Sequence, residues 1–209
     1  LRNTLILAIS SATIATVIGT AAAEGIYKMR SKLLKTTITS VTNIPMMNPE
    51  IVTGISMMLL FVFIGALFGK TGTLGFATLT IAHVTFELPY VILNVLPKLR
   101  QTDIHLSEAA QDLGCTPIQS FFKVVLPQIM PGIISGLMMA FTLSVDDFII
   151  SYFVTGSGVK NLSIMVYTMS KRVNPSINAV STLVVVIITV ALVIINVVPA
   201  IAAKRPKKA

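Results

Sequence analysis

The chain has 209 residues, of which 54% are hydrophobic and only 11% are charged, and its formal net charge is +8. An average soluble domain is nearer a quarter charged and under half apolar, so this composition excludes a disordered chain and disfavours an ordinary soluble domain. The single cysteine, Cys115, excludes an internal disulfide and a cysteine-based zinc cluster. The composition therefore favours an integral membrane protein.

Long segments with few charged residues predict the membrane spans, since about 20 apolar residues cross the hydrocarbon core. We expect an all-α, polytopic transmembrane bundle within a single domain over residues 1–209. Its five spans are predicted at about 3–23, 38–68, 75–97, 132–154 and 179–202. An alternative for the first segment is a signal peptide, but similar segments follow it.

Two features inside these spans concern their geometry. The second span contains Pro45 and Pro49, and proline removes a backbone donor, so we expect a kink there. Gly132 and Gly136 have the spacing of small residues that lets two helices approach closely.

Lysine and arginine indicate the orientation. The loops at 24–37 and 98–131 and the C-terminal tail together contain eleven of these residues, against five on the opposite side. Cytoplasmic loops carry the excess of basic residues, which predicts a cytoplasmic C-terminus and an external N-terminus. With Leu1 outside, nothing precedes the first span to start insertion, so we expect a further helix upstream. Basic residues beside lipid headgroups also account for the net charge without a nucleic-acid partner.

The loop between the third and fourth spans contains two helical patterns. Apolar residues recur at i, i+3, i+4 and i+7 from Leu106 and again from Ile118. Gly114 is suited to end the first helix, and Thr116 with Gln119 forms a capping box for the second. We therefore expect two short amphipathic helices that meet at a glycine. Their apolar face would dock into a partner groove or lie against the membrane or the chain's own bundle.

A longer motif runs through the same loop. Glu108-Ala109-Ala110 is followed after three residues by Gly114, and after nine more by Val124-Val125-Leu126-Pro127. This pattern resembles the EAA loop of bacterial ABC importer membrane subunits, in which isoleucine stands where this chain has Val124. The resemblance implies a coupling helix that docks on a cytoplasmic ATPase dimer, so that ATP-driven motion enters through residues 104–127. ATP and Mg would be bound by that ATPase and no cofactor by this chain. It also implies a six-span fold, of which five spans are present.

Acidic residues within membrane segments are costly and usually functional. Four lie in or beside the predicted spans: Glu50, Glu87, Asp146 and Asp147. They share one sign and no basic residue lies within a span, which favours a cationic solute. Phe148 and Tyr152, one helical turn apart, add aromatic faces that can hold ammonium groups. An alternative role for the two aspartates is to cap a neighbouring backbone.

Two stretches, 47–56 and 141–156, resemble the C-type permease subunit of spermidine/putrescine importers. The resemblance rests on Asn48-Pro49-Glu50 and on Ser144-Val145-Asp146-Asp147-Phe148, whereas Glu87 is a pathway candidate on physical grounds alone. The resemblance implies a multi-pass protein of the bacterial inner membrane and a second, homologous permease subunit. It also implies an extracytoplasmic solute-binding protein, which would dock on the external loop at 155–178. Importers of other cationic or small organic solutes share parts of the motif and remain an alternative.

Other function classes find less support. An ion-driven secondary transporter could use the membrane acids as proton sites, but it has no need of the patterned loop. No arrangement of catalytic residues points to an enzyme. His83 and His105 lack partners at metal-ligand spacing, so we expect His83 to be a hydrogen-bonded residue of the bundle or part of the pathway.

Overall fold

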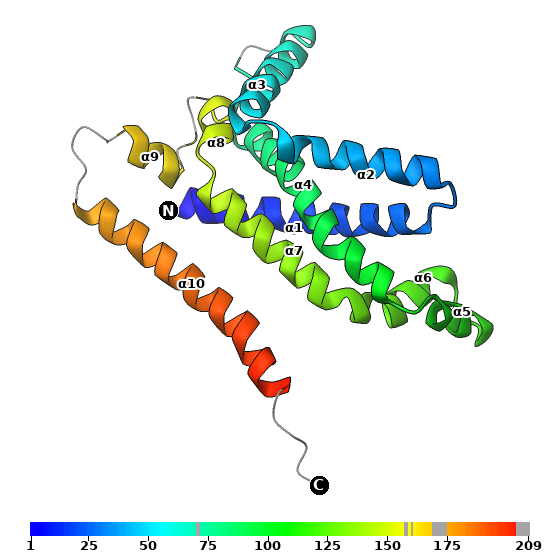
Figure 1. The fold of residues 1–209 in the computed structure, drawn as a ribbon. Coiled ribbons are helices and arrows are strands. Elements are labelled where there is room, and N and C mark those ends of the chain that lie inside the picture. Colours follow the sequence, from blue (N-terminus) through cyan, green and yellow to red (C-terminus); the bar gives the residue numbers. More distant parts are fainter. Residues whose placement is uncertain (70–71, 157–158, 160, 169–174, 204–209) are drawn as a thin grey trace. The chain divides into compact units, whose positions relative to one another are not determined.

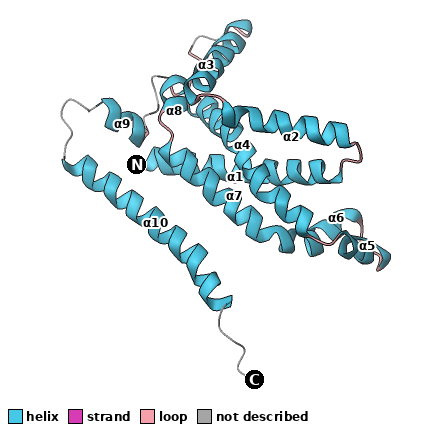
Figure 2. Ribbon diagram, in the orientation of Figure 1, coloured by secondary structure: helices cyan, strands magenta, loops and turns pink. Residues whose placement is uncertain are grey.

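In this computed structural model, residues 1–69, 72–156, 159, 161–168 and 175–203 are described, and their secondary structure is helical throughout (Figures 1 and 2). The helices are α1 (Arg2–Lys28), α2 (Lys32–Met47), α3 (Glu50–Leu67), α4 (Phe76–Gln101), α5 (Ile104–Asp112), α6 (Pro117–Ser120), the π-helical turn η1 (Phe121–Val125), α7 (Leu126–Asp146), α8 (Ile149–Val154), α9 (Leu162–Thr168) and α10 (Pro175–Ala203). The residues form two compact units, Leu1–Ile164 and Met165–Ala209. The all-α prediction is confirmed.

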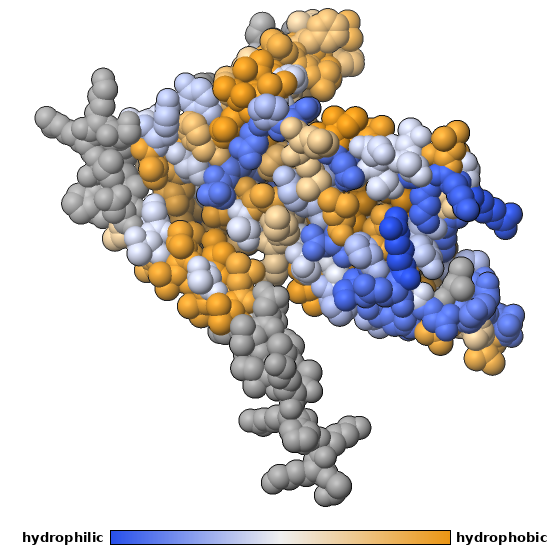
Figure 3. Space-filling view, viewed as in Figure 1, coloured by the Kyte–Doolittle hydropathy of each residue, from blue (hydrophilic) through white to orange (hydrophobic). Residues whose placement is uncertain are grey.

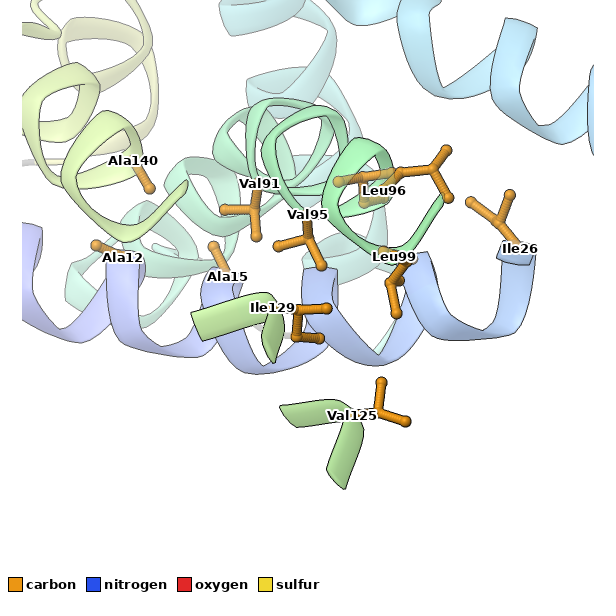
Figure 4. Close-up of a cluster of buried hydrophobic side chains, with 12 residues drawn as sticks. Ala12, Ala15, Ile26, Val91, Val95, Leu96, Leu99, Val125, Ile129 and Ala140 are labelled. Carbon is orange, nitrogen blue, oxygen red and sulfur yellow. The ribbon is translucent and has the colours of Figure 1, made fainter. Parts of the chain in front are cut away.

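Helices α1, α4 and α7 form the core of the first unit. The buried face of α1 is made of small residues such as Ala12 and Ala15, which allow neighbouring helices to approach closely. Val91 and Val95 of α4 and Ile129 of α7 lie against this face (Figure 4). Close packing of these three helices creates the interior in which the polar residues described below are enclosed.

Helix α7 meets α4 along its glycines. A Cβ atom placed on Gly132 would lie 2.9 Å from the carbonyl oxygen of Asn94 and 2.7 Å from Cγ of Lys98. A Cβ atom on Gly136 would lie 3.4 Å from Cα of Val91. Both contacts agree with the close helix packing predicted from the glycine spacing.

Gly132→Ala is therefore expected to destabilise the bundle by about 1–3 kcal/mol, the usual cost of forcing an extra carbon into a packed interface. The measurement is thermal unfolding of the purified protein in detergent. Gly25→Ala in α1 is the matched control, because a Cβ there meets nothing within 4 Å. That control should leave stability unchanged or raise it, since alanine favours helix over glycine. Equal melting temperatures for the two variants would contradict the prediction.

The second predicted span is wrong in its N-terminal part. The structure divides 38–68 into two helices, α2 and α3, which separate at Asn48 and Pro49. Asn48 adopts an extended conformation, with φ of −77° and ψ of 141°, as residues before proline do because the proline ring clashes with a helical neighbour. Pro45, in contrast, lies inside α2. The apolar span begins at Glu50, and α2 contributes no buried residue.

The fourth predicted span, 132–154, is also revised. Helix α7 ends at Asp146, and α8 begins at Ile149 after a short break. At its other end, α7 continues without interruption from α6 through η1. The predicted second short helix of the loop is therefore the first part of a longer helical segment, Pro117–Asp146.

Four helical segments in the described part of the chain are long and apolar enough to cross a membrane: Arg2–Lys28, Glu50–Leu67, Phe76–Gln101 and Pro117–Asp146. The fifth predicted range falls within α10, whose described apolar stretch, Ala179–Val193, is shorter. Helix α3 exposes Leu59, Phe63 and Leu67, as expected of a helix that faces lipid. Hydrophilic side chains gather over the α1–α2 turn and α5, at one end of the first unit (Figure 3).

That end carries two of the three basic clusters used to predict the orientation. Lys28 at the end of α1 and Arg30 after it line the same pocket as Asp103 and Ser107, so the two loops that were predicted to be cytoplasmic lie together. The tail at 204–209 and the predicted external residues Lys160, Lys171 and Arg172 lie outside the described residues.

Candidate functional site

The α5–α6 corner is built by local hydrogen bonds around a glycine. Gly114 has a φ of +88°, in the left-handed region that favours glycine. Its N–H donates to the carbonyl of Gln111 at 2.9 Å, and the N–H of Cys115 donates to that of Ala110 at 3.1 Å. These bonds satisfy carbonyls at the end of α5, as in common glycine-based helix caps. The predicted glycine cap is confirmed.

The start of α6 is capped as the sequence predicts. Thr116 accepts a hydrogen bond on Oγ1 from the N–H of Gln119 at 3.3 Å, and the Gln119 side chain accepts one from the N–H of Thr116 at 3.1 Å. Two hydrogen bonds then tie α5 to α6. Ser120 Oγ lies 2.9 Å from Ser107 Oγ and 3.0 Å from the Ser107 carbonyl. The α5–α6 corner is therefore held in a defined conformation by its own hydrogen bonds, with Ser120 buried between the two helices.

The outer surface of this corner is apolar. Leu113 is 88% exposed and Ile118 70% exposed, and Leu106 and Phe122 are also exposed. The second predicted amphipathic face is divided: Val125 is buried in the bundle core and Phe121 packs beside it, whereas Ile118 and Phe122 face outward. The corner thus joins the core on one side and presents an uncovered apolar surface on the other.

The residues predicted to couple to an ATPase occupy different environments. Glu108, Ala109 and Pro127 are exposed, Ala110 is half-buried, and Leu126 packs against the bundle core. Glu108 Oε2 lies 3.1 Å from Nδ1 of His105 on the outer face of α5. Gly114 forms the corner itself. Of this set, the exposed members can contact a partner directly, and Leu126 and Gly114 can position them.

A pocket of about 460 Å³ lies where the ends of α1 and α4 meet the start of α5. Glu24 and Lys28 form an ion pair of 2.8 Å in its wall, and Asp103 and Ser107 border it from the loop side.

At the other end of the unit, a buried polar network surrounds His83 of α4. Its Nδ1 lies 2.8 Å from Ser144 Oγ of α7, and its Nε2 lies 3.0 Å from Ser151 Oγ of α8. Its two ring nitrogens also approach carboxylates: Nδ1 lies 3.7 Å from Glu87 Oε1, and Nε2 lies 3.4 Å from Asp147 Oδ2. His83 is 1% exposed, so the imidazole bridges two acids inside the bundle.

Asp147 also ends one helix and begins the next. Its Oδ1 accepts a hydrogen bond from the N–H of Ile150 at 3.1 Å, and its Oδ2 accepts one from Ser151 at 2.8 Å. These are N–H groups of the first turn of α8, which have no partner within the helix. The capping role left open for the aspartates is therefore the one that Asp147 adopts.

Glu87 connects the network to α1. Ser11 Oγ donates to Glu87 Oε1 at 2.9 Å and lies 3.0 Å from Ser144 Oγ. The other carboxylate oxygen, Oε2, is buried without a hydrogen-bond partner, and Glu87 is 0% exposed. An unsatisfied buried carboxylate oxygen is unfavourable, so this oxygen can accept one further donor.

The remaining predicted pathway residues are more accessible. Glu50 in the first turn of α3 and Asp146 at the end of α7 are exposed. Tyr152 of α8 is 49% exposed, and its ring lies 5.5 Å from that of Phe148. Helix α3 packs on α8 close to Glu50, since a Cβ on Gly54 would lie 3.1 Å from Cδ2 of Phe153. The four acids thus separate into a buried pair and an exposed pair.

The sequence reasoning missed His83 as the partner of the buried acids. The predicted spans contain no lysine or arginine, and His83 was expected as a hydrogen-bonded residue of the bundle or part of the pathway; its hydrogen bonds are confirmed. His83 and Glu87 are four residues apart on one helix, a spacing that places them on the same face. This spacing was the sequence feature that could have predicted the contact between His83 and Glu87. The contact between His83 and Asp147 depends instead on the break in the helix after α7.

Comparison with known proteins agrees with these features. Residues 15–206 match the family described as "Binding-protein-dependent transport system inner membrane component". The putrescine transport system permease protein PotI of Escherichia coli (strain K12) is 40% identical over 181 residues, which are 86% of this chain and 64% of that relative. The chain thus spans less than two thirds of the length of PotI.

Two further relatives are named for spermidine and putrescine. PotC of Escherichia coli (strain K12), a spermidine/putrescine transport system permease protein, is 37% identical over 89% of this chain and 68% of that relative. PotC of Haemophilus influenzae (strain ATCC 51907 / DSM 11121 / KW20 / Rd) is 34% identical over 93% of this chain and 73% of that protein. The chain belongs to the family of inner-membrane components of binding-protein-dependent transport systems.

Proposed function

We propose that this chain is a membrane-spanning subunit of an ATP-driven importer for polyamines such as spermidine and putrescine. The observation that carries the proposal is the capped α5–α6 corner, an exposed apolar element attached to a bundle with acidic groups at its opposite end. The names of the similar permeases support the solute class.

In this proposal the corner receives the force of ATP hydrolysis. A cytoplasmic ATPase dimer binds ATP and Mg and contacts Glu108, Ala109 and Pro127, together with the exposed apolar residues of α5 and α6. The continuous helical segment from Pro117 to Asp146 carries the movement across the membrane. This chain itself hydrolyses nothing and needs no cofactor of its own.

The solute passes along the acidic end of the bundle. A polyamine presents ammonium groups separated by methylenes, which carboxylates and aromatic faces can hold together. The exposure of Glu50, Asp146 and Tyr152 supports their direct contact with the solute. Phe148 packs beside Tyr152, and the buried carboxylates of Glu87 and Asp147 add negative charge behind this surface.

The proposal includes further partners, which the family membership supports. A second, homologous permease subunit completes the pathway, and an extracytoplasmic solute-binding protein delivers the solute to the external loop. The α5 end and the C-terminus face the cytoplasm of a bacterial cell, lipid covers the apolar outer faces, and nucleic acid has no part.

The test is uptake of labelled spermidine by vesicles that contain the complete complex and its binding protein. We expect uptake to require ATP on the side of the vesicle membrane that carries the ATPase. Uptake should stop when ATP is replaced by a non-hydrolysable analogue. Uptake driven by a proton gradient without ATP would instead identify a secondary transporter. ATP-driven uptake of a different cationic or small organic solute would retain the importer and exclude the polyamine.

A further inference from the structure

The buried network contains one cationic group for two carboxylates. His83 lies between Glu87 of its own helix and Asp147 of the α7–α8 junction, and α1 contributes only the hydroxyl of Ser11. The titratable groups that face the imidazole are therefore these two acids. With a neutral imidazole both charges lie uncompensated in a membrane segment, which is unfavourable; with an imidazolium, one is balanced.

A second observation points to a further ligand. Glu87 is fully buried, and its Oε2 has no hydrogen-bond partner. Serine hydroxyls already occupy both ring nitrogens of His83 and one oxygen of Glu87. The network therefore lacks one hydrogen-bond donor, for Oε2 of Glu87, and one positive charge. An added cationic donor would supply both.

We propose that the Glu87–Asp147 pair is a cation site whose resident occupant is the tethered imidazole of His83, so that protons compete with the ammonium groups of the solute. This inference rests on the proposed polyamine function and adds a specificity-determining residue to it. When His83 is protonated, it balances one of the two carboxylates and so weakens their attraction for an ammonium group. When it is neutral, an ammonium group is the cation that satisfies them.

The geometry explains how such an exchange would be linked to movement. Asp147 holds the first turn of α8, and His83 holds Asp147 to α4. Release of the imidazole contact would remove one polar link between the α7–α8 junction and α4 when the carboxylates become available, while the apolar packing of α8 on α4 remains. Entry of the solute would then loosen this end of the bundle.

The experiment compares the wild-type complex with one that carries His83→Gln. Glutamine keeps polar atoms for the serines but has no titratable proton. ATP-driven spermidine uptake is measured at several concentrations from about pH 5 to pH 9, a range that includes the pH at which an ordinary histidine changes charge. In the wild type, the apparent KM should rise as pH falls, by up to about tenfold per pH unit for one competing proton, while kcat stays constant. In His83→Gln, the KM should change less than about twofold over the same range.

Controls separate this role from a structural one. Thr142→Ala removes a hydroxyl of α7 that donates to the Met138 carbonyl of its own helix at 2.8 Å, outside the network, so it should retain the wild-type pH dependence of KM. The affinity of the binding protein for spermidine is measured at each pH and is common to all variants. If His83→Gln keeps the wild-type pH dependence, or if pH changes kcat and not KM, the inference is overturned while the proposed function stands. Failure of the wild-type complex to take up spermidine with ATP would instead overturn the proposed function.

A second variant covers the case in which His83→Gln does not assemble. Glu87→Gln leaves a single carboxylate, which the imidazole balances alone. The apparent KM should then rise at high pH, where the wild type binds best, and its pH dependence should flatten. A KM with the wild-type value and pH dependence would count against the cation site.

Discussion

A complex in which this chain carries Gly114→Val is expected to lose ATP-driven uptake by about tenfold or more, with its membrane bundle intact. Gly114 has a φ of +88°, which a β-branched residue adopts only as an outlier. The left-handed conformation costs about 1–2 kcal/mol for a residue with a Cβ, which corresponds to about a factor of ten in an equilibrium. The corner between α5 and α6 should therefore open, and the proposed ATPase contact should be lost with it.

The structure allows steric effects to be separated from conformational ones at this position. A Cβ on Gly114 would meet no heavy atom within 4 Å, so the loss would come from backbone conformation alone. Gly114→Asn is the matched control, because asparagine enters the left-handed region more readily, and it should retain more uptake than the valine variant. The measurements are vesicle uptake, co-purification of the ATPase and thermal unfolding. Normal uptake by Gly114→Val would show that the corner is not needed for coupling.

Replacing Asp147 and Asp146 one at a time should give opposite results. Asp147→Ala removes the cap of α8 and leaves His83 without one of its two acids. Breaking a buried charged pair from one side costs about 3–5 kcal/mol, and a lost helix cap adds about 1 kcal/mol. We therefore expect the complex that contains Asp147→Ala to assemble poorly and to unfold at a lower temperature.

Asp146→Ala changes the exposed neighbour at the end of the same helix. The complex should assemble normally, and spermidine uptake should fall by about tenfold, as expected for the loss of a charge-assisted hydrogen bond worth about 1.5–3 kcal/mol. Assembly is measured by gel filtration and uptake in vesicles. Normal uptake by Asp146→Ala would remove this residue from the pathway, and normal assembly of Asp147→Ala would show that the capping contacts are dispensable.

The predictions for Asp146 and Asp147 depend on which polar residues are enclosed, and the sequence determines this only in part. Charge-free length predicted the spans, but it could not separate α2 from α3, because 38–49 and 51–68 both lack charged residues and the helices are divided at the extended backbone of Asn48. The interruption of 132–154 was indicated only by the alternative capping role of Asp146 and Asp147. The capping contacts of Asp147 are local, to Ile150 and Ser151, whereas its approach to His83 joins distant parts of the chain.

By itself, the sequence determined the features that depend on neighbouring residues. The glycine cap at Gly114 and the capping box at Thr116 join atoms within five positions along the chain, so their residue types specify them. Tertiary structure alone decided the partners of the buried polar groups. Ser11 and Glu87 are 76 positions apart, and His83 lies 61 positions from Ser144 and 68 from Ser151. Such contacts exist only because the small residues of α1 and α7 let three helices approach closely enough to enclose them.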